Sequence, residues 1–153
     1  MSHSVHFVFV VHDHQPVGNF DSVIEQAYHD SYKPLLELLR RHPGIRLAIH
    51  TSGPLAEWLE THHPEYLDQL AELAEARQIE IVGGAFSEPV LAMLPARDRI
   101  GQIRRYTDWL EHRLKTRVSG MWVAERVWDP GMTADLAAAG IDWTILDDTH
   151  FKA

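Results

Sequence analysis

The most chemically informative segment of the chain runs from Met121 to Trp128 and places a carboxylate between two tryptophans. Glu125 stands directly before Arg126, with Trp122 and Trp128 on either side of the pair. Flat aromatic faces bind pyranose rings, and a positioned carboxylate attacks or stabilises an anomeric carbon. A neighbouring guanidinium favours the charged carboxylate, so Arg126 is expected to keep Glu125 ionised. The pattern is typical of a sugar-cleaving site, although a buried ion pair between core tryptophans would give the same residues.

Each of five predicted strands leads into a cluster of polar residues. Short runs of β-branched and apolar residues predict strands at 5–11, 45–49, 79–82, 118–123 and 141–146. The clusters that follow them are His12–Pro16, His50–Gly53, Gly83–Pro89, Glu125–Trp128 and Asp147–His150. The carboxyl ends of parallel strands meet at one rim of an α/β fold, so the clusters are expected to form one site. Separate buried ion pairs would have no reason to share that rim.

Helical patterns separate the predicted strands. Apolar stripes predict helices that begin at Asp21, a suitable N-cap, and near Pro64, Pro95 and Thr133, with a break or restart at Pro34. Alternating strands and helices imply parallel strands joined by right-handed crossovers.

Two α/β architectures satisfy this alternation. One is an open doubly wound sheet and the other is part of a (β/α) barrel. No glycine-rich nucleotide-binding loop follows any strand, which weakens the first. The first strand, at 5–11, is expected to be buried on both faces, and His62–His63 is expected in a loop.

Composition limits the classes of partner. The 153 residues suffice for one domain with its own core, and the formal net charge of -8 disfavours nucleic acid and anionic membranes. The chain contains no cysteine, which excludes disulfides and thiolate metal sites. No signal segment or membrane-length apolar run is evident, so the expected location is the cytoplasm.

Histidines at the end of the first strand permit a second interpretation. His12 and His14 are two residues apart, so both side chains point to one face of a strand. This spacing suits a divalent metal, and His50 and His150 are available as further ligands. A metal-dependent hydrolase such as a polysaccharide deacetylase is therefore an alternative. Two histidines that grip neighbouring sugar hydroxyls satisfy the same pattern without a metal.

Glu88 is a second candidate carboxylate. It follows Gly83-Gly84, which permit backbone conformations that a Cβ forbids, and it precedes Pro89. Glu88 is expected either to bind substrate hydroxyls or to lie in water at the start of a helix.

At these motifs the chain resembles glycoside hydrolase family 57, the retaining enzymes that act on α-glucans. The matching segments are His14–Phe20, Gly83–Leu91 and Trp122–Trp128, and Asp147–Phe151 is similar to the family's next strand end. The resemblance covers nearly the whole chain. It implies that residues 1–153 are the N-terminal part of an incomplete, seven-stranded (β/α) barrel, of which five strand units are present.

The resemblance also implies a division of roles. Glu125 is the expected catalytic nucleophile, and the activity is that of an α-amylase or a 4-α-glucanotransferase, with no cofactor and no metal. The expected residues that bind the α-glucan or maltooligosaccharide are His12, His14, Gln15, Glu88, Trp122, Arg126, Trp128 and His150. Asp13 stands where the family commonly has Asn.

One expected component has no counterpart among the five strand units. The family's general acid/base is an aspartate on a later strand, and Asp147, Asp148 and Glu88 carry no specific sign of replacing it. The hypotheses therefore include an inactive sugar-binding fragment. Unpaired apolar strand edges also predict self-association or pairing with a missing C-terminal part.

Overall fold

Five parallel strands form the centre of the computed structural model, which describes residues 4–151. They are β1 (Val10–Asp13), β2 (Leu47–Thr51), β3 (Ile79–Gly84), β4 (Gly120–Trp122) and β5 (Trp143–Thr144). Each strand pairs in parallel with the next one along the chain, in the order β1-β2-β3-β4-β5. This confirms the predicted α/β class.

The strand order and the curvature of the sheet favour the barrel over the doubly wound sheet. A doubly wound sheet reverses its strand order at a switch point, and this sheet does not. In addition, the rings of His12 on β1 and Trp122 on β4 stack with centroids 4.6 Å apart. Three strand spacings in a flat sheet would separate these strands by about 14 Å. The sheet therefore curls in the manner of an incomplete barrel.

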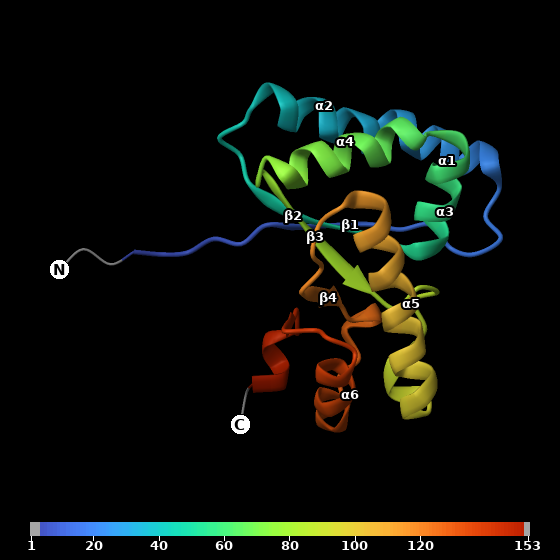
Figure 1. The fold of residues 1–153 in the computed structure, drawn as a ribbon, viewed down its shortest axis with the longest axis vertical. Coiled ribbons are helices and arrows are strands. Elements are labelled where there is room, and N and C mark those ends of the chain that lie inside the picture. Colours follow the sequence, from blue (N-terminus) through green and yellow to red (C-terminus); the bar gives the residue numbers. More distant parts are fainter. Residues whose placement is uncertain (1–3, 152–153) are drawn as a thin grey trace.

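The helices lie along the chain between the strands. They are α1 (Asp21–Ala27), a π-helical segment (Tyr28–Tyr32), α2 (Lys33–Arg41), α3 (Gly53–His62), α4 (Pro64–Glu75), α5 (Ala96–Leu114) and α6 (Thr133–Ala138), with 3₁₀ turns at Leu91–Met93, Ala124–Arg126, Pro130–Met132 and Asp148–Phe151. Figure 1 shows α1 to α4 gathered at the β1–β3 end, with α5 and α6 towards β4. No helix within residues 4–151 combines the length and apolar character needed to cross a membrane.

The sequence analysis did not predict α3. Its amino end, Gly53-Pro54, resembles a turn signal, but Pro54 occupies the first helical turn, where its missing N–H leaves no bond unmade. His62 is the last residue of α3 and His63 joins α3 to α4. The connection is therefore a single residue rather than a loop.

Pro34 does not break the helical region, which continues from α1 through a π-helical turn into α2. The preceding turn, Tyr28–Tyr32, is π-helical, and the Lys33 N–H donates to the Tyr28 carbonyl. This wider turn carries the chain from α1 directly into α2, where Pro34 lies at the amino end and needs no donor.

The predicted first strand was wrong in extent and burial. Only residues 10–13 pair with β2, and the preceding segment leads away from the sheet (Figure 1). Val5 and Phe7 are 91% and 87% exposed. Apolar sequence alone does not make a strand, because β2 begins at Leu47 and offers no partner further back. The fourth and fifth strands are likewise shorter than predicted.

The helices pack on the sheet through two apolar clusters. The larger lies between α1–α5 and the β2–β3 pair, with Leu36, Leu59 and Tyr106 fully buried. The smaller surrounds β4 and α6 and includes Met121 and Met132. All five residues of β2 are buried, so the rigid centre of the sheet lies directly beneath the rim that carries the polar clusters.

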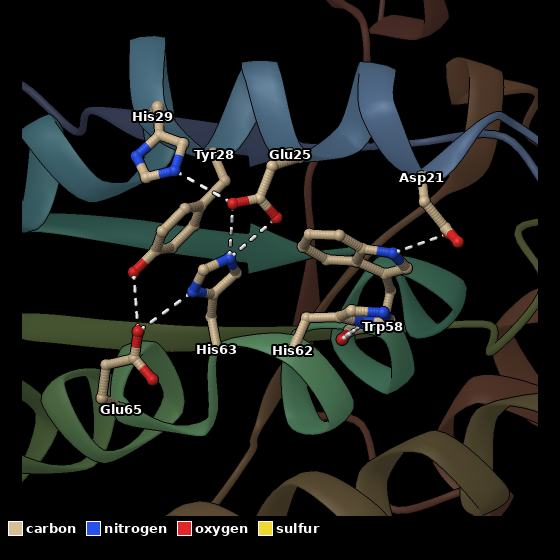
Figure 2. A network of polar contacts seen from close by, with 8 residues as sticks. All are labelled: Asp21, Glu25, Tyr28, His29, Trp58, His62, His63 and Glu65. Atoms are coloured by element: carbon tan, nitrogen blue, oxygen red, sulfur yellow. Dashed lines mark hydrogen bonds and ion pairs between the residues drawn. The ribbon is translucent and has the colours of Figure 1, made fainter.

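A polar network joins α1 to the α3–α4 corner (Figure 2). One ring nitrogen of His63 lies 3.0 Å from Glu25, the other lies 3.1 Å from Glu65, and the Tyr28 hydroxyl donates to Glu65. The rings of Tyr28 and His63 stack at 3.7 Å. These contacts, led by His63 for Glu25 and by a backbone hydrogen bond for Glu65, lower the pKa of both carboxyl groups.

In the same network, Asp21 does not act as the predicted N-cap. Phe20 occupies that position, and its side chain makes no capping hydrogen bond to α1. The Asp21 carboxylate instead accepts a hydrogen bond from the Trp58 indole at 2.9 Å (Figure 2). A long-range partner therefore replaces the local one.

We expect His63→Phe to lower thermal stability at pH 6 and to change it little at pH 3. Phenylalanine keeps the stacking on Tyr28 but removes both contacts with the carboxylates. A carboxyl group with a depressed pKa stabilises the fold above its ordinary pKa of 4.5, and this contribution is lost as pH falls. Melting curves across this range test the difference. His112→Phe, at an exposed position on α5, is the control, and an equal loss at both pH values would contradict the prediction.

Candidate active site

A cleft of about 500 Å³ opens at the carboxyl ends of the strands. It is lined by His12, His14, Pro16, Val17, Ser87, Glu88, Trp122, Ala124, Glu125 and Arg126. These residues belong to β1, β3 and β4 or follow them, so the cleft brings together three of the five clusters that were predicted to form one site. Six of the nine predicted site residues line this cleft.

Strand alternation separates the histidines from the aspartate between them. His12 and His14 both face the cleft, with stacked rings 5.6 Å apart, as predicted from their spacing. Asp13 points the other way and accepts a hydrogen bond from Tyr66 on α4 at 3.1 Å. Its burial raises its pKa to about 6, against the effect of the Tyr66 hydroxyl. Asp13 therefore packs behind the site.

A buried histidine supports His12 from the neighbouring strand. His50 on β2 is paired in register with His12, and their Nδ1 atoms lie 2.8 Å apart. Partial removal of the His12 ring from water lowers its pKa to about 4, with the charge of His14 acting in the same direction. Burial also lowers the pKa of His50 far below its ordinary value. Both rings are therefore neutral near pH 7.

Glu88 is the buried carboxylate of the cleft. Its side chain is 8% exposed, and one oxygen contacts His14 Nδ1 directly. The other oxygen lies 3.8 Å from His12 Nε2 and 3.6 Å from His50 Nδ1. Burial, reinforced by the charge of Glu125, raises the pKa of Glu88 to about 7. The group is therefore partly protonated near neutral pH and can donate as well as accept a hydrogen bond.

Glu125 is the exposed carboxylate of the cleft. It lies in the 3₁₀ turn directly after β4, where its backbone has φ 54° and ψ 7°. Arg126 and Glu88 also adopt the left-handed region, with φ 52° and 49°. Non-glycine residues pay about 1–3 kcal/mol for sparsely populated backbone conformations, which cluster at functional sites. Three such residues line this one cleft.

Arg126 does not hold Glu125 as predicted. Its guanidinium pairs instead with Asp147, at 3.2 Å. Glu125 and Arg126 are both exposed, which also excludes the buried ion pair. The Asp147 pKa is lowered mainly by hydrogen bonds from Thr149, with a smaller contribution from Arg126. Adjacency in sequence therefore did not predict the ion-pair partner of Arg126.

The remaining predicted residues lie outside the cleft. Gln15 donates to the Tyr32 hydroxyl and lines a smaller hollow beside α3. Trp128 packs against the smaller apolar cluster and lines a hollow with Trp143. His150 is exposed, with Nε2 3.3 Å from the Arg126 carbonyl. The two tryptophans that flank Glu125 in sequence therefore face different hollows, and Trp122 alone of the pair lines the cleft.

The sequence analysis missed part of this arrangement. It considered His50 only as a metal ligand, and the in-register pairing of the first two strands would have placed it beside His12. It explained Gly84 by backbone freedom, yet neither Gly83 nor Gly84 has a positive φ. A Cβ on Gly84 would lie 2.7 Å from His50 Nε2. The glycine is needed for close approach.

The cleft also contains a set of donor atoms spaced for a cation. His12, His14 and Glu88 each offer one ligand atom within 4.8 Å of the other two. His14 and Glu88 already contact each other directly through two of these ligand atoms. A cation would have to break that contact in order to bind. The same groups are suited to hydroxyl groups, which need donors and acceptors side by side.

The fold and the cleft together define an incomplete (β/α) barrel with carboxylates and histidines at its carboxyl-terminal rim. Comparison with known proteins extends this description. The profile of Glycosyl hydrolase family 57 matches residues 8–153. The chain belongs to this family.

Individual relatives agree with this assignment. An α-amylase of Pyrococcus furiosus is 47% identical over the whole chain, and a 4-α-glucanotransferase of Thermococcus kodakarensis is 47% identical over 97% of it. The crystal structure of 4-α-glucanotransferase from Thermococcus litoralis superposes on 96% of the chain with a TM-score of 0.92 and 44% identity. The chain spans 23% of the length of each of these proteins.

We expect Glu88→Gln to stabilise the fold increasingly as pH rises from 4.5 to 8. A raised carboxyl pKa means that ionisation costs folding free energy, and this cost develops between the ordinary pKa of 4.5 and the folded value of about 7. We expect a gain of about 1–2 kcal/mol at pH 8, after allowance for solvent screening. Chemical denaturation at several pH values measures it.

Glu80→Gln is the matched control, because Glu80 is an exposed carboxylate on β3. It should show no such trend. A stability difference for Glu88→Gln that stays constant between pH 4.5 and 8 would show that Glu88 is not the buried titrating group.

Proposed function

We propose that the chain forms the nucleophile-bearing part of an α-glucan-active retaining enzyme. Glu125 attacks the anomeric carbon of an α-1,4-linked glucan and forms a glycosyl-enzyme. Water then gives hydrolysis, as in an amylase, or a second glucan gives transfer, as in a 4-α-glucanotransferase. The relatives named above include both activities, and the residues of this cleft are compatible with either.

One observation supports this role most directly. Glu125 is an exposed carboxylate, held in a strained turn at the carboxyl end of β4, beside the buried Glu88. A nucleophile needs an ionised oxygen that reaches the sugar, whereas a carboxyl group that binds hydroxyls benefits from a proton. Glu88 is buried and its pKa is raised to about 7, whereas the Glu125 carboxylate is exposed to the cleft.

The other cleft residues are suited to binding the sugar. His14 and Glu88 offer a paired acceptor and donor for neighbouring hydroxyls. Trp122, stacked on His12, supplies apolar surface to the same cleft. The general acid/base of the proposed mechanism is a further carboxyl group, which the resemblance assigns to a later strand of the family's barrel.

An activated substrate tests the nucleophile without that acid. A 5-fluoro-α-glycosyl fluoride loses fluoride without protonation, and its fluorinated ring slows hydrolysis of the adduct. We expect the carboxylate oxygen to form one bond to the anomeric carbon as the carbon–fluorine bond breaks, which gives a covalent adduct on Glu125. Intact mass and peptide mapping locate it.

Glu125→Gln should remove the adduct but retain binding of maltooligosaccharide, measured by calorimetry. Glu80→Gln, distant from the cleft, should react like the unmodified chain. An adduct on another residue, or undiminished labelling of Glu125→Gln, would contradict the proposal. Binding without any labelling would instead support a sugar-binding role.

The metal-dependent alternative makes an opposite prediction. A deacetylase that depended on His12 and His14 would lose activity with a chelator and regain it with zinc. We expect labelling at Glu125 to be unchanged, within about 20%, after treatment with a chelator, because displacement by a carboxylate requires no metal. Loss on chelation with recovery on added zinc would favour the alternative.

A further inference from the structure

The contact between His12 and His50 restricts where each ring carries its proton. Both rings are neutral near pH 7, and their Nδ1 atoms are 2.8 Å apart. Two lone pairs at this distance repel each other, and two N–H groups clash. One Nδ1 therefore donates and the other accepts, which leaves two arrangements of the pair.

The surroundings of His50 favour one arrangement. His50 is fully buried, and its Nε2 has no hydrogen-bond partner among the described residues. Gly84 lies against this atom, close enough that a Cβ would lie 2.7 Å from it. A proton on Nε2 would be a buried N–H without an acceptor, a costly arrangement. A proton on Nδ1 is bonded to His12.

The surroundings of His12 favour the same arrangement. Its Nε2 lies 3.8 Å from one oxygen of Glu88, which has no hydrogen-bond partner within residues 4–151. When Glu88 is ionised, a lone pair on Nε2 would face the lone pairs of that oxygen, whereas an N–H there is attracted to it. The distance is too long for a direct hydrogen bond, so the N–H remains available to a ligand in the cleft.

We propose that His50 is a positioning residue that donates from Nδ1 to His12 and so fixes His12 as an Nε2–H donor towards the cleft. Stacking on Trp122 holds the ring plane, and His50 selects the tautomer. The Nε2–H group of His12 can then donate a hydrogen bond to a sugar hydroxyl but cannot accept one. The consequence for sugar binding rests on the proposed function, but the tautomer itself does not.

Nitrogen-15 spectroscopy of histidine-labelled protein tests the proposal directly. Two-bond proton–nitrogen correlations at pH 7 distinguish the two tautomers, and His12→Asn and His50→Phe assign the signals. We expect His12 protonated at Nε2 and His50 at Nδ1. The reverse pair of tautomers in the unmodified chain would overturn the proposal.

Two substitutions separate selection of the tautomer from packing. His50→Phe fills the buried site without a donor, so the Nδ1–H form of His12 should become detectable. His50→Asn restores an N–H donor near the position of Nδ1 and should return His12 to the Nε2–H form. His112→Phe, at an exposed position, should leave the His12 signals unchanged. A single unchanged tautomer in His50→Phe would show that His50 does not set it.

Labelling by the glycosyl fluoride provides a second readout. We expect His50→Phe to slow labelling of Glu125 about tenfold, mainly through the maximal rate, and His50→Asn to recover most of it. If the unmodified chain is not labelled, the proposed function fails, while the tautomer measurement still decides the role of His50. Labelling of His50→Phe at the unmodified rate would contradict the catalytic consequence.

Discussion

The parallel, sequential pairing of the strands is the constraint on which the rest of the structure depends. Each strand enters the sheet beside its predecessor, so all five carboxyl ends fall on one rim. In-register pairing then places His12 beside His50, and Gly84 beside Trp122. Curvature of the sheet adds the last step, because it brings Trp122 on β4 onto His12 on β1. The pairing and curvature of the strands therefore determine the position of the cleft, and the loops add to it.

Rigid support below the rim permits strain at the rim itself. β2 is buried along its whole length, and Tyr106 on α5 hydrogen-bonds the Thr51 carbonyl at the end of that strand. Such a base can hold Glu88 and Glu125 in left-handed conformations that isolated turns would avoid. The strain points the two carboxyl groups into one cleft. A left-handed backbone alone does not identify these positions, because Arg77 and Lys115, just after α4 and α5, share it.

The sequence allowed prediction of the features that depend on local pattern. The α/β class, the shared rim and the common face of His12 and His14 follow from hydrophobic periodicity and from alternation along a strand, and the structure confirms them. Features that depend on long-range partners were missed. Asp21 binds Trp58 instead of capping its helix, and Arg126 binds Asp147 instead of stabilising Glu125. The prediction of a strand before β1 was wrong for the same reason, because the apolar residues of that segment have no neighbouring strand to pair with.

The charge state of the cleft is consistent with the chemistry proposed for it. A glycosidic bond breaks through a transition state with positive charge near the anomeric carbon. Cationic histidines beside that carbon would oppose the charge, and burial keeps His12 and His50 neutral near pH 7. The raised pKa of Glu88 limits repulsion between the two carboxylates without adding a cation. The cleft thus places the neutral rings of His12 and His50 near one exposed carboxylate, Glu125, which can stabilise a developing positive charge.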